Sequence, residues 1–273
     1  ATMRLQGRWE CIVQLGIFDR TEGRVVSWGS GSVISAHGHI LTAAHVLRVF
    51  SGGKDTPAVL VGVFEGGERL TRWSYSCAMA SEEEALKLKA ADESLVDLAV
   101  LQIKAKIEAN PPVFGGSLES LTIVKETTIE PANLRMSYLR TSKAKLEGDC
   151  NVRLFGYPKQ RGNIRLTREK GVAAVQDAGW VKVNAKDVAT SGFSGGPLLN
   201  DKGEIVAVMS KDYNDKKGHA QALKSGTTNL SWFRHLSMVQ PEHRIPVLEQ
   251  EMLADLAVDA RLESVREIAK VGQ

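Results

Sequence analysis

The chain has 273 residues, of which 43% are hydrophobic, so it can bury one or two cores and does not have the composition of a disordered protein. The formal net charge is only +3 and no segment is polybasic, which argues against a nucleic-acid partner. No run of about 18 apolar residues occurs, so we expect no membrane-spanning segment and no membrane partner.

The cysteines predict reduced thiols and no disulfide scaffold. Cys11, Cys77 and Cys150 are far apart and form no CxxC pair that could hold zinc. This pattern indicates a reducing compartment, and we expect a cytoplasmic protein with no bound metal. The N-terminal Ala1-Thr2-Met3 does not begin a signal peptide, and a periplasmic or secreted protein that has lost its signal is the alternative.

The first part of the chain, up to about Ile103, predicts an antiparallel barrel or sandwich, because short β-prone runs alternate with turns that contain glycine. The runs are Cys11 to Phe18, Arg24 to Trp28, Ser32 to Ser35, His39 to Thr42, Ala58 to Phe64, Leu70 to Met79 and Leu98 to Ile103. Before the last run, Ser81-Glu82-Glu83-Glu84 opens a stretch to about Ala91 that predicts a capped surface helix.

A less regular stretch from about Lys104 to Gly148, rich in proline and glycine, predicts a connection between two half-domains. A second set of β-prone runs follows it. These runs are Asn151 to Tyr157, Asn163 to Gln176, Trp180 to Ala185, Pro197 to Leu199, Glu204 to Ser210 and His219 to Leu223. Asn200-Asp201-Lys202-Gly203 predicts a hairpin turn between two of them.

The pattern changes near the end of the chain. Thr228 to Leu236 predicts a helix, and from Pro246 onward apolar residues recur at helical spacing with charged residues between them. One interpretation is a terminal helix that packs on the preceding domain. The other is a stalk that leads to a regulatory partner or to a further domain.

Ser194 is the candidate nucleophile. It lies in Ser191-Gly192-Phe193-Ser194-Gly195-Gly196-Pro197, where glycines allow a substrate carbonyl to approach the backbone and let amide groups point at it. A hydroxyl also needs a base to remove its proton. A glycine-rich turn without chemistry is the simpler interpretation of this segment when it is taken alone.

The same segment satisfies the GxSxG pattern of an α/β-hydrolase, with Asp212 and His235 in the required order after Ser194. That fold needs a helix directly after the serine. Here Gly195-Gly196-Pro197 leads into a short apolar strand and a hairpin turn, so the pattern favours a different fold.

His45 is the candidate base, because it follows the β-prone Ile40-Leu41-Thr42 and a tight turn of small residues. Asp97 lies inside an apolar run, and burial of a carboxylate is costly unless a partner such as an imidazole N–H pairs with it. His37 and His39 lack a nearby third ligand, so they are better explained as turn and strand residues than as a metal pair. A structural histidine and a capping aspartate are the simpler alternatives for His45 and Asp97.

These segments together resemble the trypsin-like (chymotrypsin-fold) serine protease superfamily, and within it the bacterial Deg (HtrA) type without a PDZ domain. The segments are Gly29-Ser30-Gly31-Ser32-Val33-Ile34, Leu41-Thr42-Ala43-Ala44-His45, Asp97-Leu98-Ala99-Val100-Leu101, Gly156-Tyr157-Pro158 and the segment around Ser194. The resemblance implies a His45-Asp97-Ser194 triad, with the amides of Gly192 and Ser194 as the oxyanion hole.

The resemblance also implies an all-β fold of two perpendicular six-stranded antiparallel barrels, followed by a C-terminal helical segment. We place the N-terminal barrel at residues 5–115, a connection at 116–148, the C-terminal barrel with its terminal helix at 149–236, and a helical tail at 237–273. Too few residues follow Leu236 for a PDZ module.

Phe193 departs from the pattern of these relatives. Zymogen-activated members have an aspartate before the nucleophile that pairs with a newly cut N-terminus, and Deg-type members usually have an asparagine. We expect Phe193 to pack under the loop as an apolar anchor. The cysteines that flank the catalytic histidine in secreted relatives are also missing, with Val46 in the following position.

The resemblance places Val188 at the base of the primary pocket, Ser210 and Asp212 on one wall and Gly218 on the other. Val188 in place of an acidic residue predicts preference for a small or medium apolar residue before the cleaved bond. Asp212 or Asp187 could instead select a basic side chain.

The predicted activity is therefore that of a serine endopeptidase that acts on polypeptides through an acyl-enzyme and needs no cofactor, since no Walker or dinucleotide motif is present. The alternative is a binding or scaffold protein that keeps the fold without cleavage. A third interpretation is a latent protease that a regulatory protein activates, with the C-terminal helix as its docking element.

Overall fold

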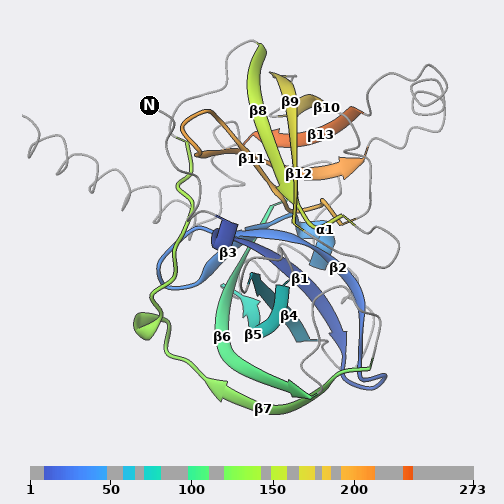
Figure 1. The fold of residues 1–273 in the computed structure, drawn as a ribbon, viewed down its shortest axis with the longest axis vertical. Coiled ribbons are helices and arrows are strands. Elements are labelled where there is room, and N and C mark those ends of the chain that lie inside the picture. Colours follow the sequence, from blue (N-terminus) through green and yellow to red (C-terminus); the bar gives the residue numbers. More distant parts are fainter. Residues whose placement is uncertain are drawn as a thin grey trace, which may run out of the picture.

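The structure, a computed structural model, describes residues 9–47, 58–64, 71–80, 98–110, 120–142, 149–158, 166–175, 180–185, 192–212 and 230–235. These residues form two groups of strands. In Figure 1 the first group, β1 to β7, lies below the second group, β8 to β13. The surface helix predicted at Ser81 to Ala91 and the helical tail predicted at 237–273 fall outside the described residues.

The first group of strands forms a ring of antiparallel pairings. Its elements are η2 (Trp9–Cys11), β1 (Ile12–Asp19), β2 (Arg24–Val33), β3 (His39–Thr42), α1 (Ala44–Leu47), β4 (Ala58–Phe64), β5 (Thr71–Met79), β6 (Ala99–Asn110) and β7 (Thr122–Thr128). They pair in the order β3-β2-β1-β4-β5-β6-β7, and β3 also pairs with β6. The β3–β6 ladder therefore joins β1 to β6 in a ring, which we call the first barrel, while β7, which falls in the predicted connection, is added at β6.

The second group is a closed antiparallel barrel. Its strands are β8 (Asp149–Gly156), β9 (Thr167–Val175), β10 (Trp180–Ala185), β11 (Pro197–Leu199), β12 (Ile205–Asp212) and β13 (Leu230–His235), and the 3-10 turn η4 (Pro131–Asn133) precedes them. The strand order is β10-β13-β12-β11-β8-β9. The all-β fold predicted from the sequence is thus confirmed.

One predicted element is wrong. Thr228 to Leu236 was expected to be helical, but Leu230–His235 is strand β13, which pairs with both β10 and β12. The strands on either side of this position each present a row of backbone N–H and C=O groups that need partners. A strand between them supplies those partners along its whole length, which a helix cannot do.

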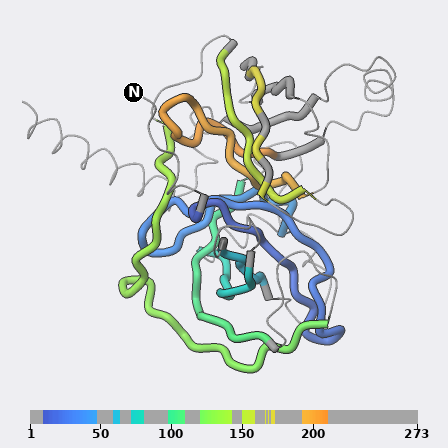
Figure 2. Tube along the Cα trace, viewed as in Figure 1, coloured from blue at the N-terminus to red at the C-terminus, as the bar shows by residue number. Residues whose placement is uncertain are grey.

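Strand β2 is continuous, although the sequence predicted two separate runs around Gly29 and Gly31. A Cβ atom at Gly31 would lie 2.8 Å from Cγ2 of Ile40 and 3.3 Å from the carbonyl oxygen of Leu41. Glycine therefore lets β3 pack closely on β2, and it does not end the strand. The unbroken path of the chain through β1 and β2 can be followed in blue in Figure 2.

Side chains of both barrels share one hydrophobic core cluster. Its buried members are Cys11, Ile12, Ile34, Leu41, Leu98, Val100, Leu139, Phe155, Tyr157, Leu166, Leu199, Ile205 and Val208. Those up to Val100 belong to the first barrel, and those from Phe155 onward come from the second barrel and the loops that join its strands. The two barrels therefore pack directly on each other through apolar contacts.

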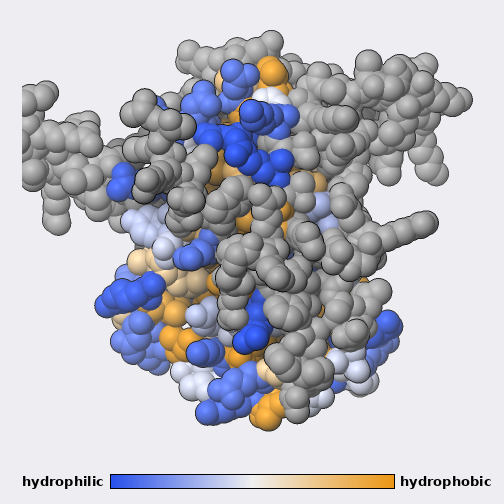
Figure 3. All heavy atoms as spheres, viewed as in Figure 1, coloured by the Kyte–Doolittle hydropathy of each residue, from blue (hydrophilic) through white to orange (hydrophobic). Residues whose placement is uncertain are grey.

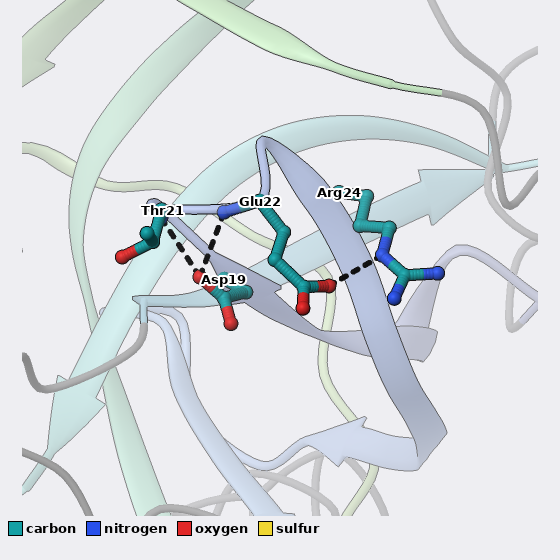
Figure 4. Close-up of polar contacts among 4 residues, drawn as sticks. All are labelled: Asp19, Thr21, Glu22 and Arg24. Atoms are coloured by element: carbon teal, nitrogen blue, oxygen red, sulfur yellow. Dashed lines mark hydrogen bonds and ion pairs between the residues drawn. The ribbon is translucent and has the colours of Figure 1, made fainter.

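The hairpin turns are built from local polar contacts. In the β1–β2 turn the Asp19 carboxylate accepts hydrogen bonds from the amides of Thr21 at 2.8 Å and Glu22 at 3.0 Å, as Figure 4 shows. In the turn between β11 and β12, the backbone N–H of Asn200 donates to the backbone carbonyl of Glu204 at 3.0 Å. The hairpin predicted at Asn200-Asp201-Lys202-Gly203 is therefore confirmed. Such short turns place consecutive strands side by side in each barrel.

On the face shown in Figure 3, hydrophobic side chains of the described residues are scattered among hydrophilic ones. The large hydrophobic residues that are exposed in the described part are Val26, Val124 and Val172. Among the described helices, none has the length and apolar character that crossing a bilayer requires.

Candidate functional site

The loop around Ser194 is shaped by glycines with positive φ angles. Gly192 has φ 107° and Gly195 has φ 84°, which are values that other residues rarely adopt. The Gly196 amide donates to the Phe193 carbonyl at 2.8 Å and closes a tight turn around the serine. Ser194 is partly exposed while both of its neighbours are buried, so the loop presents this one side chain outward.

Strand β12 holds this loop from the side of the second barrel. The Gly195 amide donates to the Met209 carbonyl at 2.8 Å, and the Met209 amide donates to the Gly196 carbonyl at 2.9 Å. Ser210 and Asp212, two of the predicted pocket residues, follow Met209 on the same strand. The other two, Val188 and Gly218, lie outside the described residues.

The two glycines after the serine are required by close backbone approach. A Cβ atom at Gly195 would collide with the Ser30 carbonyl and with the Thr42 hydroxyl, and one at Gly196 would collide with the Phe155 carbonyl. The sequence predicted that glycine was needed here for an incoming substrate. The structure adds that these glycines also make room for strands of both barrels.

Phe193 packs beneath the loop, as predicted. Its side chain is 1% exposed and belongs to a core cluster of the second barrel. The buried members of that cluster are Val152, Leu154, Phe193, Leu198, Val206, Ala207 and Met209. The loop is therefore attached to the barrel by apolar burial directly next to the partly exposed Ser194.

His45 lies in the short helix α1, directly after strand β3. Ala44, Val46 and Leu47 are buried, whereas His45 is partly exposed. The Val46 amide donates to the Ala43 carbonyl at 3.2 Å, which forms the tight turn that the small residues predicted. The buried neighbours fix the backbone of this turn, so the imidazole is attached to a rigid strand end.

The segments of His45 and Ser194 meet at strand β2. A Cβ atom at Gly29 would lie 2.8 Å from Cγ1 of Val46 and 3.0 Å from the carbonyl oxygen of Ser194. The amide of Ser30 donates to that same Ser194 carbonyl at 2.7 Å. Val46, which follows His45, and the backbone of Ser194 therefore both lie next to Gly29 of β2. They belong to different barrels.

Asp97 lies outside the described residues, so its place in the triad stays a prediction. The described chain resumes at Leu98, which is buried, and strand β6 follows. Ala99 pairs with Thr42, the last residue of β3 before the turn that carries His45. The start of β6 is thus adjacent to that turn.

The other histidines of the first barrel have a structural role in a hairpin. The Ser35 hydroxyl lies 2.7 Å from Nδ1 of His39 and accepts from the amides of His37 and His39. Burial, then the charges of His37 and Lys104, lower the pKa of His39. Among the described residues, no group of three or more His, Cys, Asp or Glu side chains is arranged to hold a metal ion.

The three cysteines form no disulfide with one another. Burial raises the pKa of the Cys77 thiol, so this group stays protonated and is a poor nucleophile. Burial also raises the pKa of Tyr157, whose hydroxyl donates to the Ile12 carbonyl at 2.9 Å. Neither Cys77 nor Tyr157 is therefore a candidate for the reactive group of the site.

The contacts of Ser30 were not predicted from the sequence, in which it stands out only as part of a motif. Ser30 is fully buried on β2, and it binds the loop around Ser194 through its hydroxyl as well as through its amide. The only local signal was a polar residue between two glycines, which does not reveal contacts with residues more than a hundred positions away.

Comparisons with known proteins point to one family. A family model described as a trypsin-like peptidase domain matches residues 29–208. The serine endoprotease from Yersinia pestis has a similar fold, with a TM-score of 0.53 and 16% identity, over 91% of this chain and 65% of that one. This chain therefore spans about two thirds of the length of that endoprotease.

A second similar structure is the inactive form of the Rv3671c protease, with a TM-score of 0.50, 17% identity, and coverage of 86% of this chain and 88% of that one. An inactive variant of the same protein from M. tuberculosis H37Rv gives the same TM-score of 0.50 and 17% identity, with 86% and 85% covered. No curated protein matches the sequence significantly. At these sequence identities, the similar structures show a shared fold and nothing more.

Proposed function

Because the chain belongs to the trypsin-like peptidase domain family, we propose that it is a serine endopeptidase in which Ser194, His45 and Asp97 form the catalytic triad. One observation carries this proposal. The Ser194 carbonyl and the Val46 side chain, next to His45, both lie beside Gly29 of β2, so side chains from different barrels can meet there.

The proposed reaction is acyl transfer to water. Ser194 attacks the carbonyl carbon of a peptide bond while His45 takes the hydroxyl proton, and His45 then protonates the departing amine. Asp97 orients the imidazole and stabilises its charged form. A water molecule, activated by His45, hydrolyses the acyl-enzyme and regenerates the Ser194 hydroxyl.

The backbone amides of Gly192 and Ser194 would stabilise the oxyanion that forms at the substrate carbonyl. Supporting this assignment, none of the described residues accepts a hydrogen bond from either amide. Two adjacent donors on a glycine-shaped turn, next to a partly exposed serine hydroxyl, are what a developing negative charge requires.

The proposed substrates are polypeptides with a small or medium apolar residue before the cleaved bond. Val188 supplies the apolar pocket base in this proposal, with Ser210, Asp212 and Gly218 around it. Cleavage of a peptide library followed by mass spectrometry would test it. Consistent cleavage after arginine or lysine would contradict the apolar pocket and favour Asp212 as the selecting charge.

A fluorophosphonate probe gives the decisive test of the proposed function, since it labels only an activated serine. We expect the wild-type chain to be labelled, and Ser194→Ala and His45→Ala to lose labelling, while Ser35→Ala, a serine near another histidine, keeps it. Absence of labelling in the folded wild type would favour a scaffold protein. Labelling that appears only after a cell extract is added would favour a latent protease with a regulatory partner.

We also propose that the protein works in the cytoplasm. The absence of disulfides among Cys11, Cys77 and Cys150 supports this assignment. Fractionation of the source cells, with detection of the chain in each compartment, would test it. Recovery in the periplasm or the medium would overturn it.

A further inference from the structure

Ser30 connects the two barrels at the loop that carries the proposed nucleophile. Its side chain is fully buried, and its hydroxyl donates to the Gly192 carbonyl at 2.7 Å while accepting from the Tyr157 amide at 2.9 Å. The Ser30 amide donates to the Ser194 carbonyl at 2.7 Å. A single residue of the first barrel thus makes three hydrogen bonds to the second barrel.

We propose that Ser30 is a positioning residue whose hydroxyl holds the oxyanion-binding loop in its competent form. This inference rests on the proposed function, and it assigns a role that the resemblance did not give to this position. The hydroxyl fixes the direction of the Gly192 carbonyl. It thereby fixes the peptide group between Gly192 and Phe193, which lies between the two amides proposed to bind the oxyanion.

The need for such an anchor follows from the glycine itself. Gly192 has a φ of 107°, and without a Cβ atom its peptide groups can rotate at little steric cost. The freedom that lets a substrate oxygen approach also lets a carbonyl turn toward the place where that oxygen binds. A directional hydrogen bond from a rigid strand restricts this rotation.

Ser30 is well suited to this task because both of its hydroxyl's interactions are with the second barrel. It is buried, and its one proton is donated to Gly192 while a lone pair accepts from Tyr157. A Cβ atom at Gly156 would lie 3.0 Å from this oxygen, so the space around it is filled. Thr42 holds the Ser30 backbone in turn, through a hydrogen bond of 2.8 Å from its hydroxyl to the Ser30 carbonyl.

Phe193 holds the same loop from the second barrel. Its side chain is buried in the second barrel, whereas Ser30 approaches from the first barrel. The apolar anchor fixes where the loop lies, and the hydroxyl fixes which way its carbonyl points. A loop held in this way needs no charged chain terminus to form, since both anchors are internal.

The test compares Ser30→Ala with Ser32→Ala. Ser32 is on the same strand, is 1% exposed, and its hydroxyl makes no hydrogen bond to the described residues, so its loss removes a buried hydroxyl without touching the loop. The measurements are kcat and KM on a peptide substrate, the rate of fluorophosphonate labelling, the pH dependence of kcat/KM, and the thermal unfolding midpoint.

We expect Ser30→Ala to lower kcat and the labelling rate by about 10- to 100-fold, with KM nearly unchanged, because positioning matters most in the transition state. The midpoint of the pH profile should not move, since His45 and its partner are intact. Ser32→Ala should keep wild-type kinetics. A Ser30→Cys variant, which keeps a weaker donor, should fall between the wild type and Ser30→Ala.

Two results would overturn the inference while leaving the proposed function standing. One is wild-type kcat in Ser30→Ala. The other is a loss of kcat that merely follows a loss of folded protein, with Ser32→Ala affected equally. If Ser30→Ala does not fold, Ser30→Cys alone decides, and wild-type kcat there together with an unchanged labelling rate would contradict the role. A folded wild type without any labelling would instead overturn the proposed function itself.

Discussion

Phe193 shows at the scale of one residue how an apolar side chain can serve a polar site. It lies between the proposed oxyanion glycine and the proposed nucleophile, and its ring is buried among strands of the second barrel. We expect Phe193→Ala to lower the free energy of unfolding by about 3–5 kcal/mol and to reduce kcat as well. Urea unfolding and peptide hydrolysis would measure both.

Phe18→Ala is the matched control, because Phe18 is also buried but lies in a separate cluster of the first barrel. It should lose similar stability and retain wild-type kcat at a temperature where both variants are folded. Unchanged activity and stability in Phe193→Ala would refute the anchor.

Gly195 allows a second prediction at the residue scale. Its φ is 84°, and a Cβ atom would collide with the Ser30 carbonyl and the Thr42 hydroxyl. Gly23 has a φ of 62° but its Cβ would meet only the Leu121 carbonyl oxygen, at 3.7 Å. Gly23→Ala should therefore lower the free energy of unfolding by about 1–2 kcal/mol, from the backbone conformation alone. Gly195→Ala should lower it clearly more and should abolish labelling by the fluorophosphonate probe. Equal costs, measured by thermal unfolding, would contradict this explanation.

The hairpin between β2 and β3 is the element that delivers His45 to its place, and its turn contains the partly buried His39. Nδ1 of His39 lies 2.7 Å from the Ser35 hydroxyl, and Gln102 donates to the His37 carbonyl at 2.7 Å. Burial, with the charges of His37 and Lys104, lowers the pKa of His39 below its ordinary value of 6.5.

The lowered pKa gives the pH dependence of stability a definite sign. The unfolded chain takes up a proton at His39 near pH 6.5, while the folded chain takes it up only at lower pH. The contribution of His39 to the free energy of unfolding is therefore fully present above pH 6.5. It is lost as the pH falls from there toward the pKa of His39 in the folded chain. The free energy of unfolding of His39→Gln should fall less steeply between pH 7.5 and 5 than that of the wild type. Identical slopes would exclude His39 as the source.

At the scale of the whole molecule, the site exists only because the barrels dock. Tyr157 illustrates this, since its hydroxyl donates to the Ile12 carbonyl and its amide to the Ser30 hydroxyl. Tyr157→Phe should lower the free energy of unfolding by about 1 kcal/mol, because a buried carbonyl loses its donor. Tyr75→Phe, at a half-buried position inside the first barrel, should cost less. Urea titration of both variants would measure the difference, and equal costs would argue against a contribution from the docking bond.

Much of this protein follows from local sequence. Alternating apolar residues determine most of the strands, and Asn200 to Gly203 determines a hairpin that the structure contains. The segments around His45 and Ser194 were found because their chemistry needs small residues and glycine at nearby positions, and such requirements leave a readable pattern. Asp97 and the pocket residues Val188 and Gly218 were chosen in the same way, and they stay predictions.

The tertiary structure alone decided the rest. Leu230–His235 is a strand because two neighbouring strands require partners for their backbone, and this requirement overrides the helix predicted for Thr228 to Leu236. Gly29 and Gly31 continue β2 because Val46 and Ile40 pack against them from other elements. Ser30 holds Gly192 across the barrel interface. Contacts between residues so far apart in the chain depend on how whole barrels pack, so they cannot be predicted from any local segment of the sequence.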